Sequence, residues 1–439
     1  MNTELLKMPA RGVTLSMIVT ALTFSMADSV CASPNDITFS KDVAPIFQRS
    51  CDHCHRPGSI APMSLLTYKD TRPWARSIKE KVLRRVMPPW HIDRNVGVQK
   101  FKDDPSLTDA QISTIVAWVD HGAPEGNPAD MPPPPHFTDL DQWHFQPDMV
   151  VSMAKPYVLK ANGGDQFLDI DVDPGLKEDK YIQAVQTKPD LGFQVVHHAS
   201  TNLVDDPDED PVGLFLNEYA IGKAADIFPE NAGRLIRPGS KIHFNLHLHP
   251  YGKETPVQVS IAFKFYPKGV VPKYVALTQH MGEVYDLDIP AGQITRSDGY
   301  FRLPRPAMIS AFQPHFHTRG KAQCMEAVYP DVRADSARPG SARTETISCV
   351  SDYQFGWSIT YPYADSVAPL LPAGTVIHIT TWHDNTDRNP HNPNPKNWVG
   401  YGQRTIDEMS FAWVSLYYLD QADYEARLAA RNAAAKSDE

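Results

Sequence analysis

The stretch KIHFNLHLH, Lys241 to His249, alternates strictly between two kinds of side chain. Its even positions are apolar and its odd positions are polar. Because successive side chains of a β-strand point to opposite faces, this alternation predicts a strand with one face in an apolar core. The runs VQVSIAFKFY (257–266) and FAWVSLYYL (411–419) are also strand-like, and clusters of Gly, Pro, Asn and Asp separate such runs from about residue 150 onward. This pattern predicts antiparallel strands in a sandwich or jelly roll.

The strand-rich region is long enough for two such units. We therefore predict two consecutive all-β antiparallel jelly-roll-like sandwiches, over residues 151–275 and 276–425. The tail, residues 426–439, has a helix-forming composition.

The region before these strands has a different pattern. In DVAPIFQRSC (42–51) the apolar residues Val43, Ile46 and Phe47 follow helical spacing. LTDAQISTIVAWVDHGAP (107–124) repeats that spacing between a cap at Thr108 and a stop at Gly122. A proline-rich linker over 128–150, which contains PPPPH, should be extended and semi-rigid. The pattern predicts a compact helical unit over residues 33–127.

The helical region contains the sequence Cys51-Asp-His-Cys54-His55, which has the spacing of a c-type haem attachment site. The two thiols would form thioethers, and His55 would bind the iron. A zinc site is the alternative, but it would need partner cysteines that the chain does not supply. This motif makes the predicted all-α unit a cytochrome c-like domain and completes a multidomain fold prediction.

The sixth iron ligand would come from farther along the chain. RRVMPPW (84–90) offers Met87, followed by two prolines that stiffen the loop. A methionine opposite histidine raises the haem potential and suits electron transfer. Met63 and Met131 are the fallback ligands.

The N-terminus has the composition of an export signal. Lys7 and Arg11 precede the apolar run Val13 to Met26, and a cleavage site near Ala32 gives a signal peptide over residues 1–32. We therefore expect a periplasmic or secreted protein. The rest of the chain contains no run of about 18 apolar residues, so we predict no membrane span. The oxidising compartment favours a disulfide between Cys324 and Cys349, with two free buried thiols as the alternative.

The formal net charge is −10. This charge leaves no broad basic surface, so we do not expect nucleic acid as a partner. Small molecules or proteins are the expected partners.

Three groups of histidines fall in the strand-rich region: His197 and His198; His243, His247 and His249; and His315 and His317. Such groups of imidazoles suit copper or zinc. His315 and His317 are two apart, so a strand places them on one side. His197 and His198 are adjacent, so a shared metal requires a β-bulge or a strand end. Any single histidine is more often an ordinary hydrogen-bonded residue, and the case depends on the three groups together.

The motifs VVHHAS, LHLHPYG, PHFHTRGKA and TIDEMSFAWVSLYY follow one another in this chain, over roughly residues 150 to 425. In this order they resemble the ascorbate-dependent type II copper monooxygenases, the family of peptidylglycine and dopamine hydroxylating enzymes. The resemblance implies two jelly-roll-like sandwiches with two coppers facing each other across a solvent cleft. It also implies an electron-transfer copper on His197, His198 and His247, and an oxygen-activating copper on His315, His317 and Met409.

Two of these assignments have rivals. His249 competes with His247, and Met325 competes with Met409. A thioether ligand favours Cu(I), the state that meets dioxygen.

The resemblance implies an exported copper-dependent monooxygenase that hydroxylates a substrate C–H bond with dioxygen. The substrate would be a small molecule or a peptide. Electrons would come from an external donor such as ascorbate and pass through the covalent haem to the copper. The alternative is a non-catalytic periplasmic haem and copper protein for electron transfer or copper binding.

Overall fold

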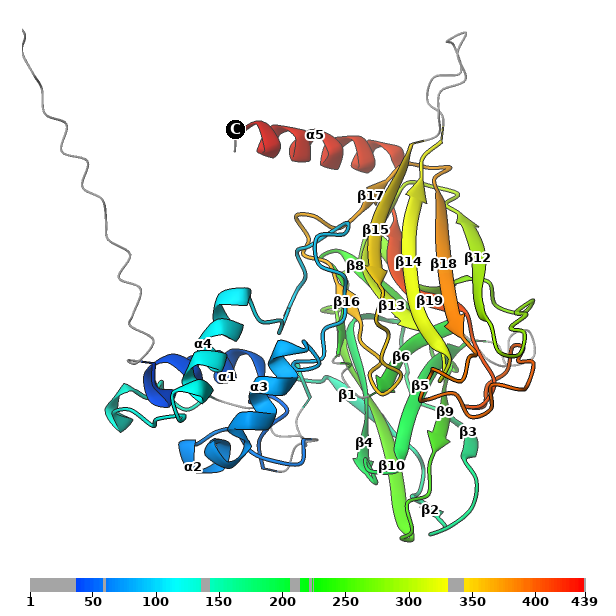
Figure 1. The fold of residues 1–439 in the computed structure, drawn as a ribbon. Helices are drawn as coiled ribbons and strands as arrows, with labels where there is room; N and C mark the ends of the chain where they lie inside the picture. Colours follow the sequence, from blue (N-terminus) through cyan, green and yellow to red (C-terminus); the bar gives the residue numbers. More distant parts are fainter. Residues whose placement is uncertain are drawn as a thin grey trace, which may run out of the picture.

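A computed structural model describes residues 37–57, 61–135, 143–205, 214–220, 223, 225–330 and 343–437. The predicted signal peptide, with Cys31, lies outside these residues. Figure 1 shows a tall β-structure with short helices beside its lower half and one helix at its upper end. Among the described residues, no helix is long and apolar enough to cross a membrane.

The N-terminal region contains four short α-helices around a small apolar core (Figure 1). They are α1 (Ala44–Ser50), α2 (Tyr68–Thr71), α3 (Ala75–Leu83) and α4 (Asp109–Asp120); a π-helical turn spans Phe39–Val43, and 3-10 turns span Arg72–Trp74 and Pro128–Asp130. The cap predicted at Thr108 is confirmed. Its side chain accepts from the backbone amide of Gln111, and the Gln111 side chain accepts from the amide of Thr108.

The prediction of an all-α cytochrome c-like domain over residues 33–127 is wrong. The helices there have only 7, 4, 9 and 12 residues. The non-helical segment 90–102 packs on the β-structure instead of on these helices. Trp90 lies edge-on against Tyr361, with ring centroids 4.8 Å apart. The amide of Val98 donates to the carbonyl of Ile347 at 2.9 Å.

The physical reason for this error lies in the apolar residues of the 90–102 segment. Trp90, Ile92 and Phe101 lack helical spacing, and they pack against the large β-core instead of the helices, with Ile92 buried and the two aromatic rings partly buried. Gly97 lets the segment approach closely. It has φ +61°, and a Cβ there would lie 2.1 Å from the carbonyl oxygen of Ile347.

The β-structure consists of one large sheet and two small ones. The large sheet has eleven strands: β1 (Met149–Ser152), β2 (Tyr157–Leu159), β4 (Lys180–Leu191), β7 (Asp226–Ile227), β8 (Ala232–Ile236), β10 (Thr255–Phe265), β11 (Tyr274–Gly282), β13 (Ala307–His315), β16 (Tyr361–Pro362), β17 (Leu370–Leu371) and β19 (Phe411–Tyr418). One small sheet contains β3 (Gln166–Val172), β5 (Val196–Val204), β6 (Leu214–Ala220) and β9 (Lys241–Leu248). The other contains β12 (Ile294–Arg302), β14 (Gly320–Val328), β15 (Thr344–Val350) and β18 (Val376–Asp384).

The strand predicted from KIHFNLHLH is confirmed as β9. Its even residues have no exposed surface and lie in one core with the inward residues of β10: Ile242, Phe244, Leu246, Leu248, Val257, Val259, Ile261 and Phe263. Burial of these side chains, at about 1.5 to 3 kcal/mol each, fixes which face of β9 points inward. The polar face of the strand therefore presents the odd positions.

The prediction of two separate antiparallel sandwiches is wrong as well. The predicted join near residue 275 falls inside the eleven-stranded sheet, where β11 pairs with β8 in parallel, Tyr274 opposite Ala232. Arg234 of β8 is buried, and its Nε and Nη2 donate to the carbonyl of Ala276 at 3.1 and 2.9 Å. We call residues 151–275 the first half and residues 276–425 the second half of the β-structure. The two halves share one sheet, because the strand pairing continues across the join.

Two smaller predictions have clear outcomes. The disulfide between Cys324 and Cys349 is confirmed and joins neighbouring strands β14 and β15. The C-terminal tail is helical, but its helix α5 (Gln421–Ser437) begins before residue 426. Arg427 of α5 donates to the hydroxyl of Tyr417 at 3.1 Å, so the helix docks on the second half.

Candidate metal centre

His197, His198 and His247 lie together in the first half. One ligand nitrogen from each ring lies within 4.8 Å of the others, and these three residues are the one such group among the described His, Cys, Asp and Glu residues. We call this group the histidine triad. The close approach places three imidazole nitrogens around a space that one metal ion can fill.

Local backbone geometry explains how two adjacent histidines share one face. β5 carries both residues, and its register against β9 shifts between Val196 and His198. This shift is the irregularity that two adjacent histidines need if they are to share one metal. It places His198 opposite His247 on β9 and lets the ring of His197 approach the same point, with centroids 5.0 Å from His247.

The nitrogen atoms of the triad are available for a metal. The Nδ1 atoms of His197 and His198 are buried and have no hydrogen-bond partner in the described part of the chain. Burial lowers the pKa of His197 to about 4 and that of His198 well below its ordinary value, so both rings are neutral at pH 7. Two buried lone pairs without partners cost stability unless a ligand satisfies them.

Asp165 holds the third ring of the triad. Nε2 of His247 donates to Oδ2 of Asp165 at 2.9 Å, which leaves Nδ1 as the free nitrogen. Nδ1 of His249 donates to the other carboxylate oxygen at 2.7 Å. His247 therefore joins the triad, while the exposed His249 supports Asp165. A carboxylate behind a histidine is the usual arrangement around a protein-bound metal.

His315 and His317 lie on the other side of the same cavity. His315 ends β13, and its ring stacks on Phe411 with centroids 4.8 Å apart. Burial lowers its pKa to about 3. Nδ1 of His317 donates to the carbonyl of Asp407 at 3.0 Å, which leaves Nε2 free. The two ring centroids are 6.1 Å apart, so the pair presents two nitrogens to the cavity.

The two candidate methionine ligands, Met325 and Met409, have different surroundings. Met325 is buried in the apolar core of the second half. Met409 follows Glu408 near the start of β19, and its carbonyl accepts from Nε2 of the buried His383 at 2.9 Å. Met409 is not among the residues that line the histidine cavity. Its thioether as a ligand stays a prediction.

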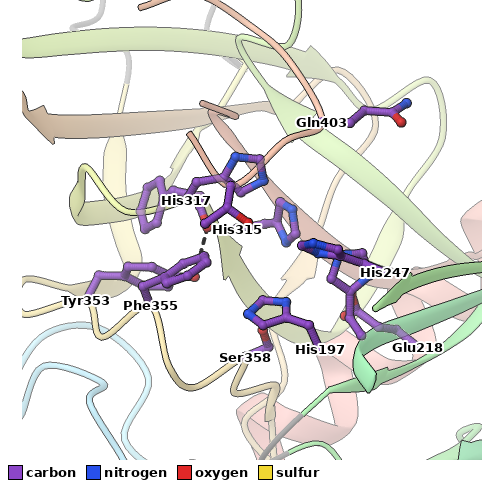
Figure 2. A pocket seen from close by; sticks show the side chains of 12 residues that line it. His197, Glu218, His247, His315, His317, Tyr353, Phe355, Ser358 and Gln403 are labelled. Carbon is purple, nitrogen blue, oxygen red and sulfur yellow. Dashed lines mark hydrogen bonds between the residues drawn. The ribbon is translucent and has the colours of Figure 1, made fainter. Parts of the chain in front are cut away.

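One cavity contains both histidine sets (Figure 2). Its volume is about 20 Å³, enough for about one water-sized occupant. Phe355 contacts one ring of each set, with ring centroids 5.4 Å from His197 and 6.3 Å from His317. Both histidine sets therefore line one nearly closed cavity, whereas the resemblance implied a solvent cleft between the two sets.

Sequence reasoning missed several residues of this cavity. Glu218 of β6 is buried, lines the cavity and accepts from Nε2 of Gln313 at 2.9 Å; burial raises the pKa of its carboxyl. Tyr353 and Phe355 come from the loop between β15 and β16. FLNEYA reads as an ordinary strand, and no motif marks the aromatic loop, so the sequence carried no signal for them.

The proposed haem residues lie at the end of α1. Cys51 and Cys54 are free cysteines, and Nδ1 of His55 donates to the carbonyl of Met63 at 3.3 Å. This hydrogen bond leaves Nε2 of His55 for an iron, and a donor set of two thiols and an oriented imidazole fits a covalent haem. Met63 and Met131 pack on the apolar core that Cys51 also contacts.

Met87 is not one of the described residues that pack on that core. It follows α3, and its amide donates to the carbonyl of Lys81 at 3.4 Å. The assignment of Met87 as the sixth ligand stays a prediction.

Comparison with known proteins leaves the family open. No family model and no curated protein matches this chain. Among solved structures, the major capsid protein P2 of bacteriophage PM2 is 12% identical over 62% of this chain and 97% of that chain, with a TM-score of 0.25. The VP2 subviral particle of infectious bursal disease virus is 11% identical over 64% and 74%, with a TM-score of 0.18. Both TM-scores are too low to support any argument about this chain.

Proposed function

We propose that this protein is an exported copper-dependent monooxygenase that hydroxylates a substrate C–H bond with dioxygen. The observation that supports it is the histidine triad, whose nitrogens converge within 4.8 Å and whose cavity also contains His315 and His317. Two sets of neutral imidazoles suit two redox-active ions better than one structural ion. Bound copper would supply one-electron transfer and dioxygen activation.

The protein side chains have distinct roles in this proposal. His197, His198 and His247 would hold the first copper, and His315, His317 and Met409 the second. Asp165 orients the ring of His247 and fixes its protonated nitrogen. The carbonyl of Asp407 does the same for His317. The buried rings around the cavity exclude bulk water from the reaction.

The haem motif would supply the electrons that an external donor delivers. Cys51, Cys54 and His55 would hold the haem, with Met87 as the predicted sixth ligand. His53 of the same motif lies against His144, with ring centroids 6.0 Å apart. Nδ1 of His144 is 2.7 Å from Nε2 of Gln186 on β4. The motif therefore contacts the β-half that contains the triad, which supports a relay between the two sites.

A non-catalytic copper or electron-transfer protein is the second candidate, and one observation favours it. Met409 does not line the cavity, so of the three predicted ligands of the second ion only His315 and His317 line it. A copper-binding protein needs the triad alone. The two candidates therefore differ in whether the second pair binds a metal.

Metal analysis of the purified full-length chain tests the proposal. We expect two copper ions and one haem in each chain. The variant His315→Ala should lose one copper and keep the other, and His197→Ala should lose the other. His243→Ala is the matched control, because His243 lies on the same polar face of β9 but bonds to Asp171 outside the cavity. Zinc in place of copper, or a single copper unaffected by His315→Ala, would contradict the monooxygenase.

A spectroscopic experiment separates the haem relay from the copper chemistry. The haem is reduced selectively, and the loss of the Cu(II) paramagnetic signal is followed. We expect the Cu(II) signal to fall as the haem is reoxidised, before dioxygen is added. Reduced haem beside unchanged Cu(II) would remove the relay and leave the copper sites to be supplied directly by the external donor.

A further inference from the structure

A second, larger cleft lies beside the histidine cavity. Its volume is about 660 Å³, within the range of small-molecule sites. The segment 403–407 separates the two spaces. Gln403 and Thr405 line the histidine cavity, whereas Arg404 and Ile406 line the cleft. Asp407 also lines the cleft, so residues of this segment, which we call the wall, line both spaces.

Aromatic rings that are exposed in the described structure form the sides of the cleft. Tyr285 is 70% exposed, Trp398 63% and Tyr401 37%. The rings of Tyr285 and Tyr401 meet edge to face at 5.2 Å, and the indole N–H of Trp398 donates to Asp288 at 2.5 Å. Exposed aromatic rings usually occur singly on a protein surface. Three of them around one cleft therefore indicate a binding surface.

The base of the cleft is apolar. Leu287 and Val399 line it, and with Ile289 they form a small core separate from the other apolar clusters of the described residues. The carbonyl and amide of Ile289 exchange hydrogen bonds with Val399 at 3.0 Å, which fixes the two segments that carry Tyr285 and Trp398. The cleft is therefore built by its own hydrogen-bonded core.

A buried arginine supplies the polar end. Arg319 is only 2% exposed and lines the cleft. Its Nε donates to Asn385 Oδ1 at 3.0 Å and its Nη1 to the carbonyl of Ile406 at 2.9 Å. No hydrogen-bond partner is found for its Nη2 within the described ranges, and the nearest carboxylate, Glu408, is 3.8 Å from Nη1. A buried guanidinium with a free N–H group favours an anionic ligand, because a charge-assisted hydrogen bond offsets its desolvation.

We propose that this cleft binds a small planar apolar molecule that carries one carboxylate. The ring of the ligand lies between Trp398 and the two tyrosines, and its carboxylate accepts from Nη2 of Arg319. Arg404 adds positive charge at the rim, although its guanidinium is paired with Asp407 at 2.6 and 2.8 Å. Binding depends on the cleft alone, so the assignment stands independently of the copper proposal.

The size of the two spaces supports placing an organic ligand in the cleft. The histidine cavity, at about 20 Å³, has room only for occupants of the size of water molecules or metal ions and excludes an aromatic ring. The cleft is the larger of the two and has both an apolar and a cationic surface. The carbonyls of Ile406 and Asp407 bind Arg319 and His317, so the wall connects the two sites through adjacent residues.

Calorimetric titration of the full-length chain with two probes tests the proposal. Phenylacetate has the ring and the carboxylate, and phenylacetamide has the same shape without the charge. We expect millimolar or tighter binding of phenylacetate and at least tenfold weaker binding of phenylacetamide. This comparison tests the role of the charge without changing the buried Arg319. Equal affinities for the two probes, or no binding of phenylacetate at 10 mM, would overturn the assignment.

Two variants locate the bound probe. Trp398→Ala should weaken phenylacetate binding at least fivefold, because it removes one aromatic side of the cleft. Tyr251→Ala is the control, since Tyr251 is 50% exposed but does not line the cleft. Unchanged binding in Trp398→Ala, or an equal loss in both variants, would place the probe elsewhere and reject the cleft.

Discussion

Oδ2 of Asp165 accepts hydrogen bonds from Nε2 of His247 at 2.9 Å and from the hydroxyl of Thr405 at 3.3 Å. Asp165 precedes β3 in the first half, and Thr405 belongs to the wall beside His317 in the second half. One carboxylate therefore contacts both a triad histidine and the wall segment across the two halves. This relationship makes Asp165 a positioning residue for the candidate metal centre.

Asp165→Asn should weaken copper binding at the triad by about 10- to 100-fold, the usual cost of losing an outer carboxylate. An amide preserves the size of the side chain but no longer holds the His247 ring with a charged acceptor. Competition with a copper chelator measures the affinity. Asp171→Asn is the matched control, because Asp171 accepts from His243 at 2.8 Å on the same pair of strands, away from the cavity. An equal loss in both variants would indicate a general effect on the sheet.

His247→Ala and His249→Ala should differ sharply. The first removes a triad ring and should abolish tight binding of one copper ion. The second removes only a partner of Asp165 and should lower the affinity by less than about tenfold, the lower limit for changes behind a ligand. Copper content after dialysis measures both. If His249→Ala lost the ion and His247→Ala kept it, the two histidines would have the opposite roles.

The copper bound by the triad should remain bound at a pH where copper has dissociated from exposed histidines. Protons compete with a metal for imidazole nitrogen only below the pKa of the ring. Burial lowers the pKa of His197 to about 4 and that of His198 well below its ordinary value. We expect His197 and His198 to keep the copper bound at pH 5, measured by equilibrium dialysis at a series of pH values. Release with a midpoint near pH 6.5 would show that the rings are accessible to water.

The same pKa shifts predict how the copper-free protein responds to acid. The unfolded chain binds protons on these histidines below about pH 6.5, whereas the folded chain does not until about pH 4 for His197. The free energy of unfolding should therefore fall as the pH drops from 6.5 towards 4. Urea titrations at pH 7 and pH 5 measure it. In the double variant His197→Ala and His198→Ala, this part of the pH dependence should disappear.

Several parts of the fold could be predicted because one segment contains their cause. The alternation in KIHFNLHLH fixes the buried face of β9, and Thr108 with Gln111 fixes the start of α4. The adjacent residues His197 and His198 required a bulge before the structure showed where it lies. In each case the deciding interactions join residues that are close in the sequence or that lie in one alternating pattern along a strand.

Other features depend on contacts that no local pattern records. The parallel pairing of Tyr274 with Ala232 joins the two halves, and nothing in either strand specifies its partner. The burial of Trp90 against Tyr361 depends on a surface about 270 residues away. Asp165 belongs to no motif, so its role at His247 follows from the packing of β3 beside β9. The sequence therefore predicts the three histidines of the triad but not the carboxylate of Asp165 that holds one of them.

The shared sheet makes a prediction about stability at the join. Arg234 is buried and donates to the carbonyls of Ala276 and Phe215, so it connects β8 with β11 and with β6. Arg234→Ala leaves two buried carbonyls without these donors and should lower the free energy of unfolding by about 3 kcal/mol or more, since each unsatisfied group costs about 1 to 3 kcal/mol. Urea unfolding followed by circular dichroism measures the loss.

Arg237→Ala is the matched control for this experiment. Arg237 follows β8 directly, but it is exposed, and Asp205, at 3.1 Å, is its one ion-pair partner among the described residues. An exposed ion pair contributes at most about 1 kcal/mol, so this variant should unfold nearly as the unchanged protein does. Two separate unfolding transitions in Arg234→Ala, with one in the unchanged chain, would identify Arg234 as the link that makes the halves unfold together. A loss below 1 kcal/mol in Arg234→Ala would instead mean that the sheet joins the halves without it.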